Sequence, residues 1–152
     1  MLKHIVSREF NVPTLVQIAG FRIRPLTIHD VDIDYEAIML SIDHLQKRKV
    51  FGDLSKWPSK TLTKEQDLID LGWHQKEFQR RTSFAYIVMN EEETNYIGCI
   101  YIYPSEKADA EVYLWVTETE YKKGTDSLLF NIVKKWIDES WPFKTVVYPG
   151  RE

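Results

Sequence analysis

Cysteine is almost absent from the sequence, since Cys99 is the only one among 152 residues. A lone cysteine excludes an intramolecular disulfide and a zinc site built on several cysteines, and it is typical of a protein of the reducing cytoplasm. The sequence also has no N-terminal apolar stretch of signal-peptide length and no run close to the ~20 apolar residues that cross a bilayer. We therefore predict a cytoplasmic protein without a membrane partner.

An excess of positive charge is also lacking. The 20 lysines and arginines are outnumbered by 23 aspartates and glutamates, which gives a net charge of −3. Nucleic-acid binding depends strongly on positive charge, and the Lys/Arg-Gly-Phe motif of the common RNA-recognition sheet is missing, so we expect no nucleic-acid partner. The four histidines show no His-Glu-x-x-His spacing, and we predict no metal site.

Aromatic residues, in contrast, are plentiful. Five Trp, eight Tyr and seven Phe make up 13% of the chain. Such side chains bury a large area, so one sizeable core is feasible. The length corresponds to about one domain. We divide the chain into an N-terminal arm, residues 1–20, and one domain, residues 21–152.

The hydrophobic pattern predicts an α+β fold with a mixed sheet flanked by helices. Period-two and continuous apolar runs predict strands at 12–18, 21–26, 83–89, 96–103, 110–116 and 143–148. Helical spacing predicts one helix from 31 to about 47, a second from 64 to about 81, and a third from 125 to the proline at 142. The last helix is expected to make a right-handed crossover, which makes the two strands that it joins parallel.

Two helix starts carry a capping pattern. Thr27 is followed three residues later by Asp30, and Thr63 by Gln66. In such a capping box the threonine hydroxyl accepts a hydrogen bond from an N–H of the first turn, and the third side chain accepts one from the threonine N–H. The pattern predicts where the first two helices begin.

Three segments carry a family resemblance. Arg-Pro-Leu-Thr at 24–27 ends the first strand of the domain, Ile-Gly at 97–98 lies in the third, and Ala-Glu-Val-Tyr-Leu-Trp-Val at 110–116 forms the fourth. Together with the order of elements, these segments resemble the GCN5-related N-acetyltransferase (GNAT) superfamily over residues 21–149. The resemblance implies the acyl-CoA N-acyltransferase fold, here without the family's last helix and hairpin, and an enzyme that uses acetyl-CoA.

The resemblance also implies where acetyl-CoA binds. In the family the fourth strand splays from the next parallel strand, the pantetheine arm lies in the gap, and the diphosphate sits on amides of the turn that opens the next helix. Carried over, the cofactor-binding residues are Leu114, Trp115, Val116, Tyr121, Lys122, Lys123, Gly124, Thr125 and Asp126. Only Gly124 matches the family's turn motif, Gln/Arg-x-x-Gly-x-Gly/Ala. Asp126 places a negative charge where the diphosphate is expected, and Lys122 and Lys123 can offset it.

Catalytic and substrate-binding residues are implied beside this cleft. Glu111 is the predicted general base that deprotonates the amine, or else a glutamate in a surface ion pair. Tyr148 is a predicted proton donor to the thiolate, or else a core residue with its hydroxyl at the rim. Phe51, Trp57 and Tyr113 are predicted to bind the substrate, the alternative being that they pack in the core.

The predicted function is N-acetyl transfer from acetyl-CoA to an amine of a small molecule or a protein. The alternative is a degenerate, non-catalytic GNAT-like module for ligand binding or protein interaction, which the altered turn and the missing hairpin favour. The missing hairpin leaves one sheet edge uncovered, and an uncovered edge invites pairing. Either the N-terminal arm or a second copy of the chain, in a homodimer, can cover it.

Overall fold

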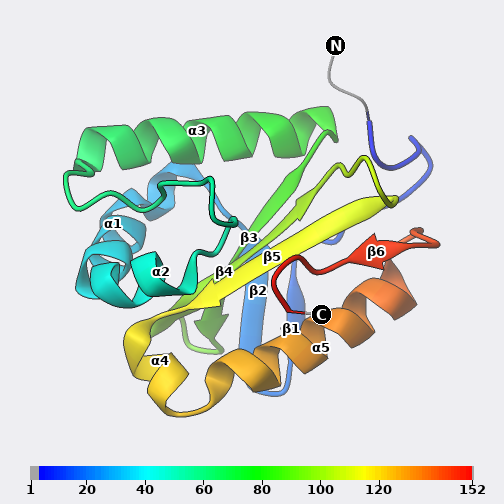
Figure 1. The fold of residues 1–152 in the computed structure, drawn as a ribbon. Coiled ribbons are helices and arrows are strands. Elements are labelled where there is room, and N and C mark those ends of the chain that lie inside the picture. Colours follow the sequence, from blue (N-terminus) through cyan, green and yellow to red (C-terminus); the bar gives the residue numbers. More distant parts are fainter. Residues whose placement is uncertain (1–3, 152) are drawn as a thin grey trace.

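The computed structural model describes residues 4–151, which form a six-stranded sheet with helices on both faces (Figure 1). The strands are β1 (Val16–Ile18), β2 (Phe21–Pro25), β3 (Phe84–Asn90), β4 (Tyr96–Tyr103), β5 (Ala110–Val116) and β6 (Val146–Val147). The helices are the 3-10 helix η1 (Ile28–Asp30), α1 (Val31–Leu40), α2 (Ile42–Arg48), α3 (Lys64–Arg80), α4 (Glu118–Lys122) and α5 (Thr125–Ser140). Neighbouring strands are antiparallel except β5 and β6, which are parallel as predicted. The predicted mixed α+β fold is confirmed.

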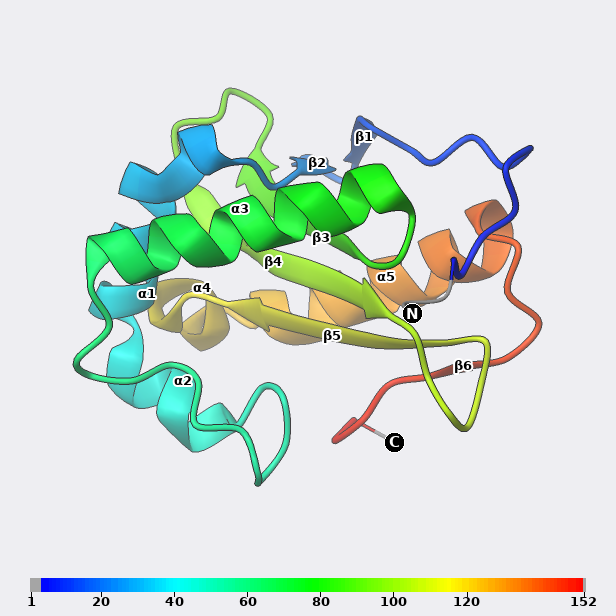
Figure 2. The ribbon, with the colours of Figure 1, turned by 90° about the horizontal axis from the view of Figure 1, so that it is seen from above.

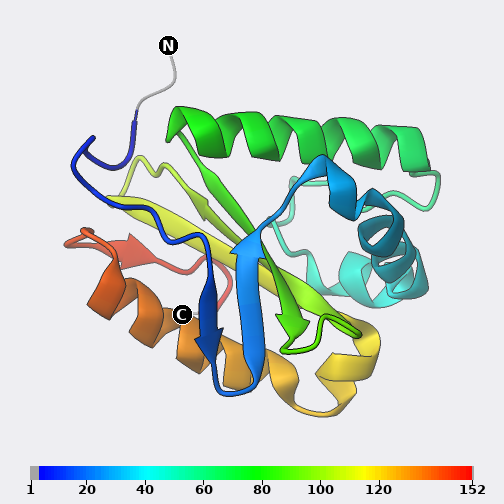
Figure 3. The ribbon, with the colours of Figure 1, turned by 180° about the vertical axis from the view of Figure 1, so that it is seen from behind.

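The sheet separates two hydrophobic clusters. Successive side chains of a strand point to opposite faces, so Val112 and Leu114 pack in the cluster that includes α5, while Tyr113 and Trp115 belong to the cluster formed with α1, α2 and α3. Figure 3 shows α3 on one side of the sheet and α5 on the other. The predicted sharing of one face by Glu111, Tyr113 and Trp115 therefore holds, and that face is the one covered by α1–α3.

Both predicted capping boxes are present. The Thr27 side chain accepts from the N–H of His29, and the Thr27 N–H donates to the carboxylate of Asp30 at 2.9 Å. The Thr63 hydroxyl accepts from the N–H of Gln66 at 3.1 Å, and the Gln66 side-chain oxygen accepts from the Thr63 N–H at 3.0 Å. The first box opens η1 and the second opens α3.

The first helix is interrupted at Ser41, so the prediction of one continuous helix from 31 to about 47 was wrong. Ser41 leaves helical geometry, with φ −113°, and its hydroxyl accepts a hydrogen bond from the N–H of Glu118 at 3.0 Å. Glu118 begins α4, a short helix that the sequence pattern did not predict. A contact between segments far apart in the chain therefore accompanies the break.

Strand β6 is shorter than the predicted 143–148, and the residues just before it are bound by the side chain of Asp109. Oδ2 of Asp109 accepts hydrogen bonds from the N–H groups of Lys144, at 2.7 Å, and Thr145, at 3.2 Å. Only Val146 and Val147 then pair with β5. Figure 1 shows β6 beside the first part of β5 alone.

The N-terminal arm packs at the sheet edge away from β6. Strand β1 pairs with β2, and the guanidinium of Arg81 donates to the carbonyl oxygens of Ser7 and Phe10. No strand of the described part of the arm pairs with β6, so the expectation that the arm covers that edge was wrong. The ends of the predicted arm (1–3) and domain (152) lie outside the described residues. No helix within residues 4–151 is long and apolar enough to cross a membrane.

Candidate functional site

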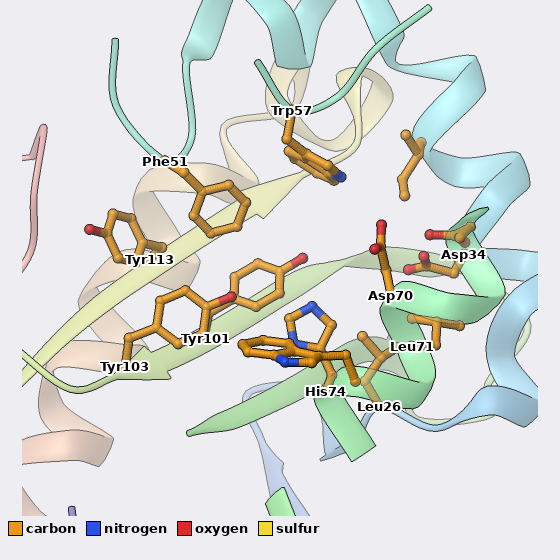
Figure 4. A pocket seen from close by; sticks show the side chains of 13 residues that line it. Leu26, Asp34, Phe51, Trp57, Asp70, Leu71, His74, Tyr101, Tyr103 and Tyr113 are labelled. Atoms are coloured by element: carbon orange, nitrogen blue, oxygen red, sulfur yellow. The ribbon is translucent and has the colours of Figure 1, made fainter. Parts of the chain in front are cut away.

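A cavity of about 380 Å³ lies between the sheet and the layer of α1 and α3. Its walls come from α1, α3, the loop before α3, and strands β4 and β5 (Figure 4). The lining residues are Leu26, Asp34, Ile38, Phe51, Trp57, Asp67, Asp70, Leu71, Trp73, His74, Tyr101, Tyr103 and Tyr113. The volume is in the usual range for a small-molecule site.

Aromatic rings form one side of this pocket, with Phe51 at their centre. The ring of Phe51 lies 5.4 Å from that of Trp57, 5.0 Å from Tyr101 and 5.3 Å from Tyr113, centroid to centroid. Burial raises the pKa values of Tyr101 and Tyr113, so these phenols stay neutral at physiological pH. The three predicted substrate-binding residues, Phe51, Trp57 and Tyr113, thus line one pocket.

Carboxylates form the other side. Asp34 of α1 and Asp67 of α3 are 3% and 2% exposed and face each other, while Asp70, one turn further along α3, is exposed at the rim. Burial raises the pKa of Asp34, and burial together with the neighbouring Asp34 raises the pKa of Asp67. Two facing carboxylates in a desolvated site repel each other unless a proton or a cation lies between them.

Hydrogen bonds around Asp34 and Tyr101 hold the pocket floor in place. The hydroxyl of Tyr96 donates to Asp34, and the indole N–H of Trp115 donates to the hydroxyl of Tyr101 at 2.8 Å. Cys99 is buried beside Tyr96, and burial raises the pKa of its thiol. A protonated thiol is a poor nucleophile, so the place of Cys99 in the pocket floor is structural.

A second, narrower cleft opens where β5 and β6 part. Of the seven residues of β5, only Ala110 and Glu111 pair with β6. The remaining space, about 40 Å³, is lined by His44, Arg48, Lys49, Val50, Tyr113, Leu114, Trp115, Val116, Asp126, Pro149, Gly150 and Arg151. Figure 2 shows α2 on the β5 side of the sheet, and α2 contributes His44 and Arg48 to this lining. Four of the predicted cofactor-binding residues, Leu114, Trp115, Val116 and Asp126, therefore lie together.

The side chain of Arg151 narrows the cleft. Its Nη1 and Nη2 donate to the two carboxylate oxygens of Asp126 at 2.8 and 3.0 Å, and Nη2 also donates to the carbonyl oxygen of Leu114 at 3.1 Å. Arg48 lies 3.6 Å from the same carboxylate. Two arginines thus offset the negative charge of Asp126. The sequence analysis had expected Lys122 and Lys123 to do so.

The turn before α5 is held by its own ion pairs instead. Lys123 pairs with the buried Glu120 at 3.1 Å, and Lys122 with Glu118 at 3.9 Å. The hydroxyl of Thr125 donates to Glu120 at 2.9 Å. Desolvation raises the pKa of Glu120, but the hydrogen bonds from Lys123, Thr125 and Asn95 outweigh it and lower the pKa overall.

Gly124 and Tyr121 complete that turn. Gly124 is the N-cap of α5 in the left-handed region, φ 87°, where a side chain would be strained. It offers no side chain to cap the first N–H groups of α5, and such groups attract anions. Tyr121 lies under Arg48, whose guanidinium carbon is 4.9 Å from the ring centroid.

The two predicted catalytic residues lie on opposite faces of the sheet. The alternation of side chains along β5 places Glu111 on the same face as the pocket. Burial is the main cause that raises the pKa of the Tyr113 phenol, and the nearby carboxylate of Glu111 raises it further. Tyr148 is 7% exposed and packs against Phe130 of α5, with ring centroids 5.3 Å apart. The structure does not bring Tyr148 together with Glu111.

The sequence analysis did not predict the three aspartates of the pocket or the two arginines of the cleft, Arg48 and Arg151. Asp67, Asp70 and His74 are spaced i, i+3 and i+7 on α3, which places them on the same face as the buried Leu71. Carboxylates on the apolar face of a helix are a signal that was present in the sequence. Burial lowers the pKa of His74 to about 4, so its imidazole is neutral at physiological pH.

Comparisons with known proteins find similar structures but no similar family model or curated sequence. No protein-family model matches the chain, and no curated protein sequence matches it. Solved structures do. The acetyl transferase from Salmonella typhimurium that modifies the N-terminal serine of ribosomal protein L7/L12 is 13% identical, with a TM-score of 0.65 over 86% of this chain and 71% of that one.

Two further solved structures show the same likeness. The ribosomal-protein-S5-alanine acetyltransferase from Vibrio fischeri is 14% identical, with a TM-score of 0.62 over 82% of this chain and 67% of that one. The microcin C7 self immunity acetyltransferase MccE, solved with acetyl-CoA and AMP, is 11% identical, with a TM-score of 0.65 over 86% of this chain and 69% of that one.

Proposed function

Because the chain has the fold of the GNAT acetyltransferases, we propose that it transfers an acetyl group from acetyl-CoA to an amine. One observation carries the proposal: Tyr113 lines both the large pocket and the cleft between β5 and β6. A group held in the cleft and an amine held in the pocket would therefore meet at one side chain. Holding two reactants next to each other is a large part of catalysis of group transfer.

The residues of the cleft fit acetyl-CoA. Beyond Glu111, the edge of β5 that faces β6 has no strand partner. Its backbone groups can therefore pair with the pantetheine amides. Arg48, Lys49 and Arg151 against Asp126 give the lining a net charge of +2, three cations less one anion, which suits a diphosphate. Acetyl-CoA would supply the activated acetyl thioester. Arg151 has to release the Leu114 carbonyl for the arm to pair there.

Glu111 is proposed as the general base. An aliphatic amine is protonated at physiological pH and must lose a proton before it attacks a carbonyl carbon. The carboxylate of Glu111 lies beside Tyr113, in the surface groove that Tyr113 also lines, and takes that proton directly or through one water molecule. The volume of the pocket between α1, α3 and the sheet, about 380 Å³, favours a small-molecule amine over a protein as the acceptor.

Binding of acetyl-CoA tests the proposal directly. A ligand at 100 times its dissociation constant stabilises the folded state by about 2.7 kcal/mol, so we expect acetyl-CoA to raise the unfolding temperature in a thermal-shift titration. AMP, which lacks the pantetheine arm, is the control ligand and should give a smaller shift. No shift with millimolar acetyl-CoA would contradict the proposal and favour a non-catalytic module.

Replacing Asp126 with glycine should tighten acetyl-CoA binding about tenfold. Two like charges 4 Å apart near a surface repel by about 4 kcal/mol before screening by solvent, and a tenfold change corresponds to about 1.4 kcal/mol. The substitution also frees Arg48 and Arg151 for the diphosphate. The dissociation constant is measured by calorimetry.

Ser127→Gly is the matched control, because it puts glycine in the same first helical turn at an exposed residue and removes no charge. Its affinity for acetyl-CoA should stay as in the wild type. If Asp126→Gly binds acetyl-CoA with unchanged or lower affinity, the diphosphate is not held beside Asp126.

A further inference from the structure

The acidic end of the pocket lies away from Tyr113, the residue that also lines the cleft. Figure 4 shows Asp34 and Asp70 on one side of the pocket and Tyr113 on the other, with Phe51 and Tyr101 between them. We propose that the pocket binds a small aliphatic diamine, with one ammonium group among Asp34, Asp67 and Asp70 and the other amino group towards Tyr113. The assignment rests on the proposed function, which places the acetyl group at Tyr113.

The first support is a buried carboxylate oxygen that lacks a donor. Oδ2 of Asp67 is buried, and no N–H or O–H group within residues 4–151 donates to it. Asp67 is 2% exposed, lines the pocket and faces the carboxylate of Asp34. A buried acceptor without a donor costs free energy. An ammonium group, with three N–H donors, satisfies such a pair of carboxylates.

The second support is that the lining carries acidic side chains and no basic ones. The thirteen lining residues include three aspartates and no lysine or arginine. The lining histidine, His74, is neutral, and its Nδ1 is buried and also without a hydrogen-bond partner. The lining therefore presents acidic oxygens and no positive charge to an ammonium group.

The third support is the aromatic wall, which points to an organic cation. Rings attract ammonium groups through their faces, and their apolar surface suits methylene groups. Phe51 and Tyr101 lie between the carboxylates and Tyr113. Within residues 4–151 no group of three His, Cys, Asp or Glu side chains is arranged to hold a metal ion. A diamine matches carboxylates at one end and hydrocarbon in the middle.

Calorimetry without acetyl-CoA tests the inference. The protein is titrated with 1,4-diaminobutane, and with 1,4-butanediol as a neutral compound of the same length. We expect 1:1 binding of the diamine and at least tenfold weaker binding of the diol. Two results would overturn the inference. One is equal affinity for the diamine and the diol. The other is no heat of binding with the diamine up to about 10 mM, a concentration that detects even a millimolar dissociation constant.

A variant locates the ammonium group. Asp70→Asn keeps the size of a rim side chain and removes its charge, and it should weaken diamine binding about tenfold. The matched control, Asp138→Asn, makes the same change at an exposed residue of α5 and should bind as the wild type does. Unchanged affinity in Asp70→Asn would overturn the placement.

The outcome separates this inference from the proposed function. If the diamine binds but no acetylated product forms in the presence of acetyl-CoA, the pocket assignment stands and the activity is refuted. If acetyl-CoA binds and the diamine does not, the cofactor cleft stands and the substrate class is refuted.

Discussion

Replacing Gly98 with alanine is expected to destabilise the protein by about 3 kcal/mol or more, the upper range for overpacking a well-packed interior. Gly98 lies in β4, where its partner in β5 is Val116. A Cβ atom at this position would lie 1.9 Å from the carbonyl oxygen of Trp115 and 2.9 Å from its carbonyl carbon. Both are backbone atoms, which cannot rotate away as a flexible side chain does. The strands would have to separate next to the cleft.

Equilibrium unfolding in urea measures this effect. Gly72→Ala is the matched control, because the same substitution in the middle of α3 meets only a side-chain carbon of Ile28 at 3.7 Å. Alanine in a helix is favoured over glycine by roughly 0.5–1 kcal/mol, so the control should be slightly more stable than the wild type. A Gly98→Ala variant of wild-type stability would contradict the close approach of β4 and β5.

The second large effect is expected at Glu111. Replacing Glu111 with glutamine should lower the rate of amine acetylation at least about 100-fold, the lower range for loss of a general base. Glutamine keeps the size of the side chain, and Glu111 is only half-buried, so the free energy of unfolding should change little. The maximal rate is measured with saturating amine and acetyl-CoA, and the fall should be in kcat.

Glu106→Gln serves as the control for this change. Glu106 is exposed in the turn between β4 and β5 and lines the same surface groove as Glu111. If loss of a negative charge near the site were enough to slow the reaction, both variants would be slow. A Glu111→Gln variant with wild-type turnover would remove this residue from the mechanism.

The strands were predicted better than the helix breaks, for a physical reason. The bounds of β4 and β5 follow from apolar residues at adjoining positions, and burial of both faces makes that pattern strong. The break at Ser41 involves a hydrogen bond from Glu118, which lies 77 residues further along the chain. A local pattern carries no information about such a contact. The contacts of the Asp109 side chain with Lys144 and Thr145, just before β6, likewise join residues far apart in the sequence.

The candidate site was predicted in part. Phe51, Trp57 and Tyr113 were singled out and do line one pocket. Asp34 was not among the predicted site residues, although its side chain is 3% exposed and lines the same pocket. Which of several acids points inward depends on how α1 and α3 pack on the sheet, and spacing alone does not determine that.

The guanidinium of Arg151 has one more consequence. It bridges Asp126 and the backbone of Leu114, so the chain's own atoms occupy part of the space between the two diverging strands. Any guest in that space must first break these bonds. A molecule that enters therefore binds less tightly than it would in an open cleft, because these hydrogen bonds are lost when it enters. Residues 126 and 151 together determine how large that loss is.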